Sequence, residues 1–308
     1  MESSISLNTR DIEPYVVRTD ISASIWGSCL DSLETNERAK VLSFVFKKDQ
    51  ERSLLSILLQ KYVILKRFGC TDFTIKRTRE NKPYVCPSVS ADVGTWNFNA
   101  SHHGDFVAIV SHDSFLVGLD IVDISTRCNW VANFAEFLEI YRKQLTTDEV
   151  KTILSFHSEN DRYTHFFVLW ALKEAYVKAV GCGIGIDLTK IHFDVTYCTR
   201  CTDDDPHNTF SGTAVMTVSS YRRNDWRFDF WSLDATHVIA VSRGPLAEAL
   251  DTYIESAWPN FASHMSIAPE CVEKQLEESA ALLNSHTILP PVVLTLDELV
   301  VAVKSSLK

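Results

Sequence analysis

The feature that most limits the possible folds is an apolar run over residues 161–188, DRYTHFFVLWALKEAYVKAVGCGIGIDL. Pro and Gly are absent from Tyr163 to Val180. This predicts one helix of about five turns that ends in a left-handed cap at Gly181. Apolar residues fall on every side of the helix, which indicates that it is buried.

This helix also carries three charged residues, Lys173, Glu174 and Lys178, within one sector about 140° wide. Burial removes the water around such charged groups, so another interaction must offset the cost of their desolvation. One explanation is structural: Glu174 and Lys178, four residues apart, would form an ion pair facing water through a gap in the packing. The other is a functional site. The pattern alone leaves both open, because structural ion pairs and active sites perturb pKa values alike.

Length and composition exclude several classes of protein. With 308 residues, 45% of them hydrophobic, the chain can form one large or two medium-sized domains. No stretch reaches the roughly 18 apolar residues of a membrane span, and the first residues lack the apolar centre of a signal peptide. We therefore expect a cytosolic protein with no membrane partner. A GxxxxGK[ST] motif is absent, which excludes a P-loop enzyme.

Charge is distributed unevenly along the chain. Residues 40–82 contain eleven Lys or Arg and four acids, a local charge of +7, whereas the whole chain carries −10. A basic stretch in an acidic protein indicates a multiply charged anion as ligand, because nucleic-acid binders are usually basic overall. The alternative is a solvated face of a Lys-rich helix.

The remaining pattern mixes helices and strands and predicts an α+β fold. Runs at 106–111 and 115–121 are expected to pair as a hairpin, and 228–241 resembles them, which suggests two similar halves. A Thr147 cap is expected to begin the helix at 148–156. The other expected helices lie at 33–46, 49–68, 130–145 and 294–307, and the other expected strands at 16–26, 73–77, 96–100, 190–195, 213–218, 226–233 and 237–242.

Two acids are candidate metal ligands. Asp120 lies near the end of an otherwise apolar strand, and Glu174 lies on the buried helix. Two carboxylates that meet suit Mg²⁺, which takes few protein oxygens and completes its shell with water and substrate phosphates. The alternative for Asp120 is a structural acid bonded to backbone amides. The basic loop 76–82, the polar turn 99–102, Lys173 and Lys178 would supply donors to the phosphates.

Three motifs carry a resemblance to a known family: GLDI at 118–121, WALKEAYVKAVGCGIG at 170–185, and RTRENKPYV with NASHHGD at 77–85 and 99–105. Together they resemble the 4′-phosphopantetheinyl transferase superfamily. The resemblance is to its large monomeric branch, which includes the surfactin-synthetase-activating and aminoadipate-semialdehyde dehydrogenase types. It extends over about residues 20 to 245.

The resemblance implies a pseudo-twofold monomer of two α+β halves, residues 1–112 and 113–250, followed by a C-terminal helical extension, 251–308. Coenzyme A would bind between the halves. Its 4′-phosphopantetheine arm would be transferred to a serine of an apo carrier domain, releasing adenosine 3′,5′-bisphosphate. The partners would be carrier domains of fatty-acid, polyketide or peptide synthases or of aminoadipate reductase.

The resemblance also implies roles for individual residues. Asp120 and Glu174 would hold Mg²⁺, and Glu174 would accept the serine proton directly or through a metal-bound water. Lys178 would hold the pyrophosphate and stabilise the leaving group. For His102 the alternative is a structural turn histidine bonded to backbone. The implied coenzyme contacts are Lys40, Arg77, Thr78, Arg79, Glu80, Asn81, Lys82, Asn99, Ala100, Ser101, His102, Lys173 and Lys178.

Two positions depart from the family pattern. Val122 stands where many members have a third acidic ligand, and Lys40 stands where the animal branch has an arginine that contacts the coenzyme. Lysine keeps the charge but loses the bidentate fork. These departures motivate one alternative, a catalytically silent relative that binds coenzyme A or carrier domains. A second alternative is an unrelated phosphate-binding enzyme.

Overall fold

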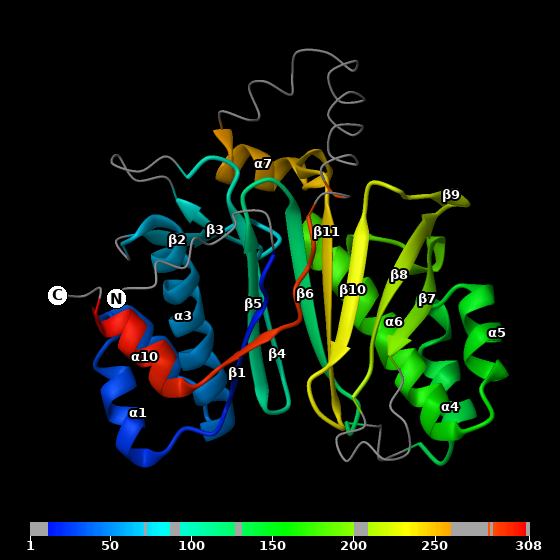
Figure 1. Cartoon of the computed structure of the whole chain (residues 1–308), viewed down its shortest axis with the longest axis horizontal. Coiled ribbons are helices and arrows are strands. Elements are labelled where there is room, and N and C mark those ends of the chain that lie inside the picture. Colours follow the sequence, from blue (N-terminus) through cyan, green and yellow to red (C-terminus); the bar gives the residue numbers. More distant parts are fainter. Residues whose placement is uncertain are drawn as a thin grey trace, which may run out of the picture.

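The computed structural model describes residues 12–70, 73–86, 93–126, 131–199, 209–259, 283 and 286–305. Two main sheets stand side by side, and a 22-residue helix packs on each of them (Figure 1). Helices and sheets are thus mixed as the sequence predicts, and the fold is α+β.

The first sheet has the strand order β12-β1-β5-β4. Helices α1, α2, α3 and α10 pack on one face of it around a shared apolar core. A separate hairpin, β2–β3, lies beside this unit. The bounds are β1 Tyr15–Arg18, α1 Ala23–Leu30, α2 Thr35–Leu42, α3 Lys47–Phe68, β2 Thr74–Arg77, β3 Pro83–Cys86, β4 Asn97–His103, β5 Phe106–His112, β12 Val292–Leu294 and α10 Leu296–Ser305.

The second sheet has the order β6-β11-β10-β8-β7, with β9 paired to β8. Helix α6 lies across it, and β6 and β11 share an apolar core with β1 and β5, which joins the two sheets. The bounds are β6 Leu116–Asp123, α4 Phe134–Ile140, η1 Arg142–Gln144, α5 Thr147–Ser155, α6 Glu159–Val180, η2 Gly183–Gly185, η3 Leu188–Lys190, β7 Ile191–Thr199, β8 Ser211–Val218, β9 Tyr221–Arg222, β10 Arg227–Ser232, β11 His237–Gly244, η4 Leu246–Glu248 and α7 Asp251–Ala257.

The expected hairpin between 106–111 and 115–121 is wrong. These runs become β5 and β6, which belong to different sheets: β5 pairs with β4 and β1, and β6 pairs with β11. Both strands are buried along nearly their whole length. The sequence of apolar and polar residues in β5 and β6 therefore does not show which side of each strand faces solvent. The order of the strands cannot be derived from it. The hairpin predicted within 228–241 is confirmed as β10–β11.

Several boundaries also differ from expectation. The expected strand at 16–26 ends at Arg18 as β1, and α1 follows it. Thr146, rather than Thr147, caps α5, because its hydroxyl accepts the Glu149 amide while the Glu149 carboxylate accepts the Thr146 amide. The expected turn at 99–102 is part of β4.

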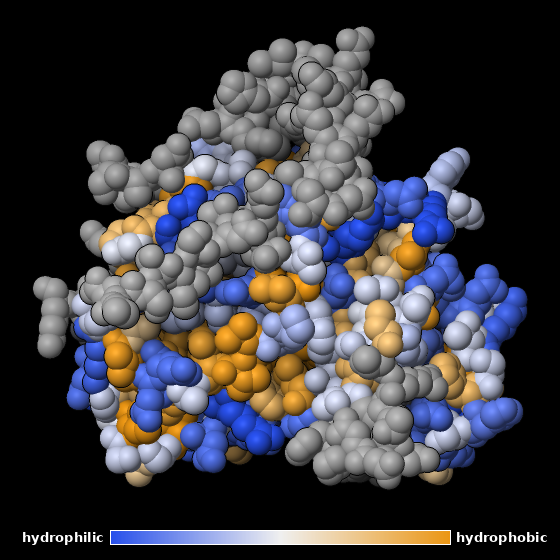
Figure 2. Space-filling view, in the orientation of Figure 1, coloured by the Kyte–Doolittle hydropathy of each residue, from blue (hydrophilic) through white to orange (hydrophobic). Residues whose placement is uncertain are grey.

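The chain near its C-terminus returns to the first sheet. The expected helix at 294–307 is α10, and β12 just before it pairs in parallel with β1. Figure 2 shows hydrophobic residues gathered over β12 and α10, where Val292, Val293 and Val301 are 37%, 62% and 67% exposed. The β12 edge of the first sheet therefore presents apolar side chains to solvent.

The long helix is confirmed as α6. Ser158 caps its start, Glu159 and Asp161 lie in the first turn, and Gly181 ends it with a φ of 86°. Thirteen of its residues are buried, on all sides, as the apolar pattern predicts. Among the described helices, none combines the length and hydropathy that crossing a bilayer requires.

Candidate active site

The site begins where β6 packs against α6 at close range. A Cβ atom added to Gly118 would lie 2.0 Å from the Ala175 carbonyl oxygen and 2.6 Å from the Ala179 backbone nitrogen. The Ser242 hydroxyl, from β11, donates to the same Ala175 carbonyl at 2.9 Å. The glycine of GLDI thus lets the strand touch the helix backbone, which brings Asp120 next to the charged sector of α6.

Asp120 is bound by two side chains from two other elements. Its Oδ1 accepts from Lys178 Nζ at 2.5 Å and from Ser101 Oγ at 2.9 Å, and Lys178 Nζ also lies 2.9 Å from Ser101 Oγ. Asp120 is only 6% exposed, so the ammonium group offsets much of its burial. The structural alternative, a Glu174–Lys178 pair, is absent from the described ion pairs, because Lys178 pairs with Asp120 instead.

Glu174 consequently keeps an ionisable carboxyl group with no hydrogen-bond or ion-pair partner among the described side chains. Burial raises its pKa, the negative charge of Asp120 raises it further, and Lys178 lowers it. Asp120 and Glu174 border the same cavity. Two carboxylates that repel each other in a half-buried site favour a cation between them.

Four side chains of β4 hold β6 in register with the first sheet. Alternate residues of β4 accept hydrogen bonds from alternate backbone amides of β6, which lies at the edge of its own sheet. Leaving one such buried amide unpaired costs about 1–3 kcal/mol. The four bonds join Asn97 Oδ1 to Val117 N (3.0 Å), Asn99 Oδ1 to Leu119 N (2.9 Å), Ser101 Oγ to Ile121 N (3.4 Å) and His103 Nδ1 to Asp123 N (3.1 Å).

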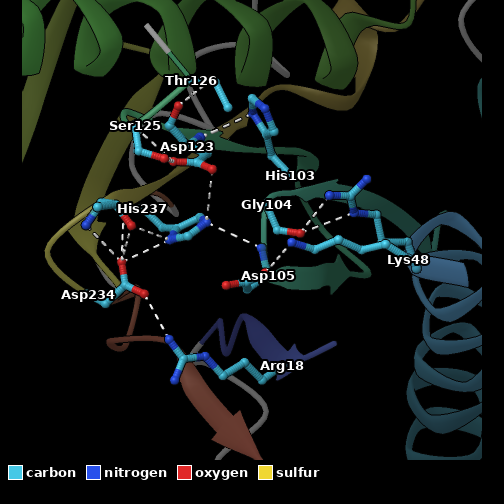
Figure 3. Close-up of polar contacts among 12 residues, drawn as sticks. Arg18, Lys48, His103, Gly104, Asp105, Asp123, Ser125, Thr126, Asp234 and His237 are labelled. Atoms are coloured by element: carbon cyan, nitrogen blue, oxygen red, sulfur yellow. Dashed lines mark hydrogen bonds and ion pairs between the residues drawn. The ribbon is translucent and has the colours of Figure 1, made fainter. Parts of the chain in front are cut away.

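A second polar cluster fixes the ends of these strands. Figure 3 shows His237 pointing toward the β4–β5 turn: its Nε2 accepts from the Asp105 amide at 3.3 Å, and its Nδ1 lies 2.9 Å from Asp234 Oδ1. Arg18 of β1 pairs with Asp234 at 3.1 Å. Gly104 has a φ of +54°, and a Cβ atom there would lie 2.0 Å from His237 Nε2. The turn therefore fits against the second sheet only with glycine at this position.

Two adjoining cavities lie on the side of Glu174 that faces β4 and α3. The larger, about 820 Å³, and the smaller, about 300 Å³, share Arg77 and His102 in their walls. The predicted residues that line the larger cavity are Arg77, Glu80, Asn81, Lys82, Asn99, Ala100, His102, Glu174 and Lys178. Lys40 lines the smaller one.

Folding brings about half of the cations in the basic stretch 40–82 next to an acid. Six of its eleven cations have acidic partners within 4.0 Å: Lys47, Lys48, Arg52, Lys61, Lys66 and Arg67. Lys40, Lys76, Arg77, Arg79 and Lys82 form no ion pair with a described residue. Partial burial and the nearby Arg77 charge lower the pKa of Lys40. Glu37 and Asp49 also line the smaller cavity, and Glu80 and Asp187 line the larger one. Cavity cations that form no ion pair, such as Lys40 and Arg77, suit a polyanion such as a phosphate ester.

Four predicted coenzyme contacts do not border these cavities. The first, Ser101, lines the cavity of Asp120 instead. Lys173 is 1% exposed and donates to Glu149 Oε2 at 2.9 Å and to the Leu188 and Ile191 carbonyls. The expectation that Lys173 binds phosphate is therefore corrected: it lies at the far end of the sector, where Glu149 of α5 meets it. Thr78 is buried inside its turn, and Arg79 is not a wall residue.

Lys82 borders the larger cavity, but its ammonium group also serves α6. Its Nζ donates to the Lys178 carbonyl at 2.8 Å and to the Ala179 carbonyl, at the negative end of the helix. Burial lowers the pKa of Lys82 from 10.5 to about 7. If Lys82 binds a phosphate, its ammonium group must do so while it also donates to the carbonyl groups at the end of α6.

The lowered pKa of Lys82 predicts how stability depends on pH. Between pH 7 and 10.5 the unfolded chain holds a proton that folded Lys82 has lost, so the free energy of unfolding rises with pH in this range. We expect the melting temperature of the wild type to rise more steeply from pH 7 to pH 9 than that of Lys82→Met. If the melting temperature depends on pH equally in the two proteins, the lowered pKa of Lys82 is contradicted.

Sequence reasoning missed part of the wall opposite the basic loop. Lys143 and Gln144 of η1, Trp170 of α6 and Asp187 also line the larger cavity. Trp170 stands one turn before Glu174, so helical spacing could have placed it on the same face. Nothing in the sequence marks the short 3₁₀ segment η1 as part of a site.

A metal ion is compatible with the donors present. Within the described residues, no group of three or more His, Cys, Asp or Glu side chains is arranged to hold a metal ion. The described oxygen ligands would be the carboxylates of Asp120 and Glu174, and the hydrogen bonds that Lys178 and Ser101 donate to Asp120 both end on Oδ1. Mg²⁺ accepts such a sparse set when water and phosphate complete its shell.

Two carboxylates beside a cavity with unpaired cations are typical of phosphoryl-transfer enzymes. A family model for the N-terminal part of 4′-phosphopantetheinyl transferases matches residues 18–114, and a model for the 4′-phosphopantetheinyl transferase superfamily matches residues 116–241. With these matches and the relatives below, the chain belongs to the 4′-phosphopantetheinyl transferase superfamily, which confirms the resemblance.

Three relatives illustrate the match. A phosphopantetheinyl transferase of a Thraustochytrium species is 30% identical over 259 residues, which cover 82% of each chain. The human L-aminoadipate-semialdehyde dehydrogenase-phosphopantetheinyl transferase is 26% identical over 274 residues, 88% of this chain and 82% of that protein. A 4′-phosphopantetheinyl transferase of Paxillus involutus is 27% identical over 190 residues, 58% of this chain and 70% of that protein.

Proposed function

We propose that the protein transfers the 4′-phosphopantetheine arm of coenzyme A to a serine of an apo carrier domain. One observation carries the proposal: Glu174 and Lys178 stand where the cation-lined cavity meets the pocket of Asp120. Unpaired Lys40 and Arg77 suit the phosphates of the nucleotide, while the carboxylates suit the reacting diphosphate.

In the proposed reaction, the serine oxygen forms a bond to the β-phosphorus while the bond from this phosphorus to the bridging oxygen breaks. Glu174 accepts the serine proton, and burial and Asp120 raise its pKa toward the range of an effective base. Lys178 orients the diphosphate and balances the negative charge on the departing adenosine 3′,5′-bisphosphate. Mg²⁺ held by Asp120 and Glu174 would add positive charge at the diphosphate.

The test is incubation of the protein with coenzyme A, Mg²⁺ and an apo acyl carrier protein, followed by mass spectrometry of the carrier. We expect the carrier to gain one phosphopantetheine, and we expect EDTA to stop the gain and added Mg²⁺ to restore it. Coenzyme A binding without any gain would instead support the silent relative. If the carrier is still loaded in EDTA, the proposed requirement for Mg²⁺ is wrong.

Further parts of the proposal follow the family. We propose that the protein acts as a monomer in the cytosol and serves carrier domains of fatty-acid, polyketide or peptide synthases or of aminoadipate reductase. We also propose the division into similar halves, 1–112 and 113–250, with a segment 251–308. In that last segment, β12 and α10 lie with the first sheet.

A further inference from the structure

Helix α7 lies beyond residue 241, where the matched family models end, yet it contacts two separate parts of the fold. Its buried side chains belong to the apolar core of the second sheet. At its start, the Leu250 amide donates to the Val180 carbonyl at the end of α6, at 2.9 Å. On its other side α7 contacts β3, above which it lies in Figure 1. The helix therefore links the end of α6 to the β2–β3 hairpin.

The turn of this hairpin forms one wall of the larger cavity. The Thr78 amide donates to the Lys82 carbonyl at 3.0 Å, and the Asn81 amide donates to the Thr78 carbonyl at 3.0 Å. Asn81 has a φ of 72°, and the Arg77 side chain donates to its carbonyl at 2.8 Å. The turn presents Arg77, Glu80, Asn81 and Lys82 to the cavity. The conformation of the turn thus decides where these cavity groups lie.

Thr252 of α7 binds the acid in this turn. Its hydroxyl donates to Glu80 Oε2 at 2.8 Å, and this hydrogen bond is the main cause that lowers the pKa of Glu80. Because Glu80 also borders the cavity, a carboxylate that could turn toward a bound nucleotide would repel its phosphates. The Thr252 hydroxyl holds one carboxylate oxygen of Glu80 on α7.

Tyr253, the next residue of α7, supports the other end of the turn. Lys82 Nζ lies 4.8 Å from the centre of its ring, and Tyr84 of β3 packs edge-on against it at 6.3 Å. An aromatic ring face attracts an ammonium group. Tyr253 is only 1% exposed, and Trp258 packs against it at 5.0 Å, so its ring is fixed by the core. Helix α7 therefore contacts the turn at both Glu80 and Lys82.

We infer that Thr252 is a positioning residue for coenzyme binding, because by holding Glu80 it keeps the turn in the shape that binds the nucleotide. This inference rests on the proposed function and adds a residue from outside the matched family regions. Thr252 is not among the described wall residues of either cavity, so it acts through Glu80. Since Glu174 and Lys178 stand on α6, loss of the Thr252 hydroxyl should weaken coenzyme binding and leave the reaction of the bound coenzyme unchanged.

The experiment compares Thr252→Val, which keeps the shape of the side chain without the hydroxyl, with Thr252→Ser, which keeps the hydroxyl. We measure KM for coenzyme A and kcat for loading of an apo acyl carrier protein, and Kd for coenzyme A by calorimetry. Thr252→Val is expected to raise KM and Kd about three- to tenfold, with kcat within about twofold of wild type. Thr252→Ser should stay within about twofold of wild type in all three.

Thr295→Val is a matched control. The Thr295 hydroxyl also donates to a carboxylate oxygen, Glu298 Oε2, at 2.8 Å, but it lies at the start of α10 and outside the described cavity walls. This hydroxyl also accepts the Glu298 amide, so Thr295→Val should lower the melting temperature. Its KM for coenzyme A should nevertheless stay at the wild-type value, which separates loss of stability from loss of positioning.

A double-mutant cycle tests whether Thr252 acts through Glu80. In the Glu80→Ala background the partner of the hydroxyl is gone, so Thr252→Val should change Kd for coenzyme A by less than about twofold. If Thr252→Val weakens binding equally with and without Glu80, the inference is wrong.

Other outcomes separate this inference from the proposed function. If Thr252→Val binds coenzyme A like the wild type, Thr252 does not position the turn, although carrier loading would still support the proposed function. If Thr252→Val lowers kcat and leaves KM unchanged, the inference is also wrong. If the wild type binds coenzyme A but loads no carrier, the proposed function fails, and the Kd values still decide the role of Thr252. If the wild type does not bind coenzyme A, both fail.

Discussion

Replacement of Glu174 by glutamine is expected to lower kcat for carrier loading by at least about 100-fold, because general-base catalysis contributes roughly that much or more. Glutamine keeps the size of the side chain but cannot accept the serine proton. Since burial and Asp120 disfavour the ionised carboxyl group, its removal should leave the melting temperature equal or higher. Steady-state loading assays and thermal melts measure the two effects.

A matched control is Glu255→Gln on the exposed side of α7, which removes an acid outside the three cavities. It should load carriers at the wild-type rate. If Glu174→Gln keeps most of its turnover, the assignment of Glu174 as base is untenable. If it loses turnover only because it melts at a lower temperature, the role of Glu174 is structural.

Gly118→Ala is expected to cause the largest loss of stability from adding a single methyl group. The new Cβ would lie 2.0 Å from the Ala175 carbonyl oxygen, so β6 must move away from α6. Overpacking against side chains costs about 1–3 kcal/mol, and a rigid backbone contact belongs at the upper end or beyond. Because the same shift would separate Asp120 from Lys178, loading activity should fall as well.

Gly27→Ala provides the comparison. Gly27 lies in α1, and a Cβ atom there would meet nothing within 4 Å. Alanine in a helix is favoured over glycine by about 1 kcal/mol, so this variant should melt at the same or a higher temperature. If Gly118→Ala melts like Gly27→Ala, the close contact of β6 and α6 does not determine the position of Asp120.

Local patterns predicted much of this fold. The buried helix with its Gly181 cap, the hairpin β10–β11 and the strand that carries Asp120 follow from periodicity and turn residues. The charged sector of α6 correctly marked Glu174 and Lys178 as residues that require an explanation. Motif spacing then supplied the family, which the relatives confirm.

What failed depends on contacts between distant segments. The sequence near Lys173 does not reveal that Glu149 of α5 comes within 2.9 Å of it, so Lys173 resembled a ligand-binding lysine. The positive charge of residues 40–82 is likewise reduced by distant acids, since Lys61 pairs with Glu37 and Arg67 pairs with Asp113. Strand order has the same origin, since β5 and β6 are adjacent in sequence yet pair in different sheets.

The four side chains that β4 extends to β6 have a consequence for how other molecules can attach. A strand at the edge of a sheet normally offers a row of amides to which a foreign peptide can add. Here Asn97, Asn99, Ser101 and His103 already occupy those amides. A visiting protein cannot extend the sheet at β6, so recognition beside Asp120 must rely on side-chain contacts alone.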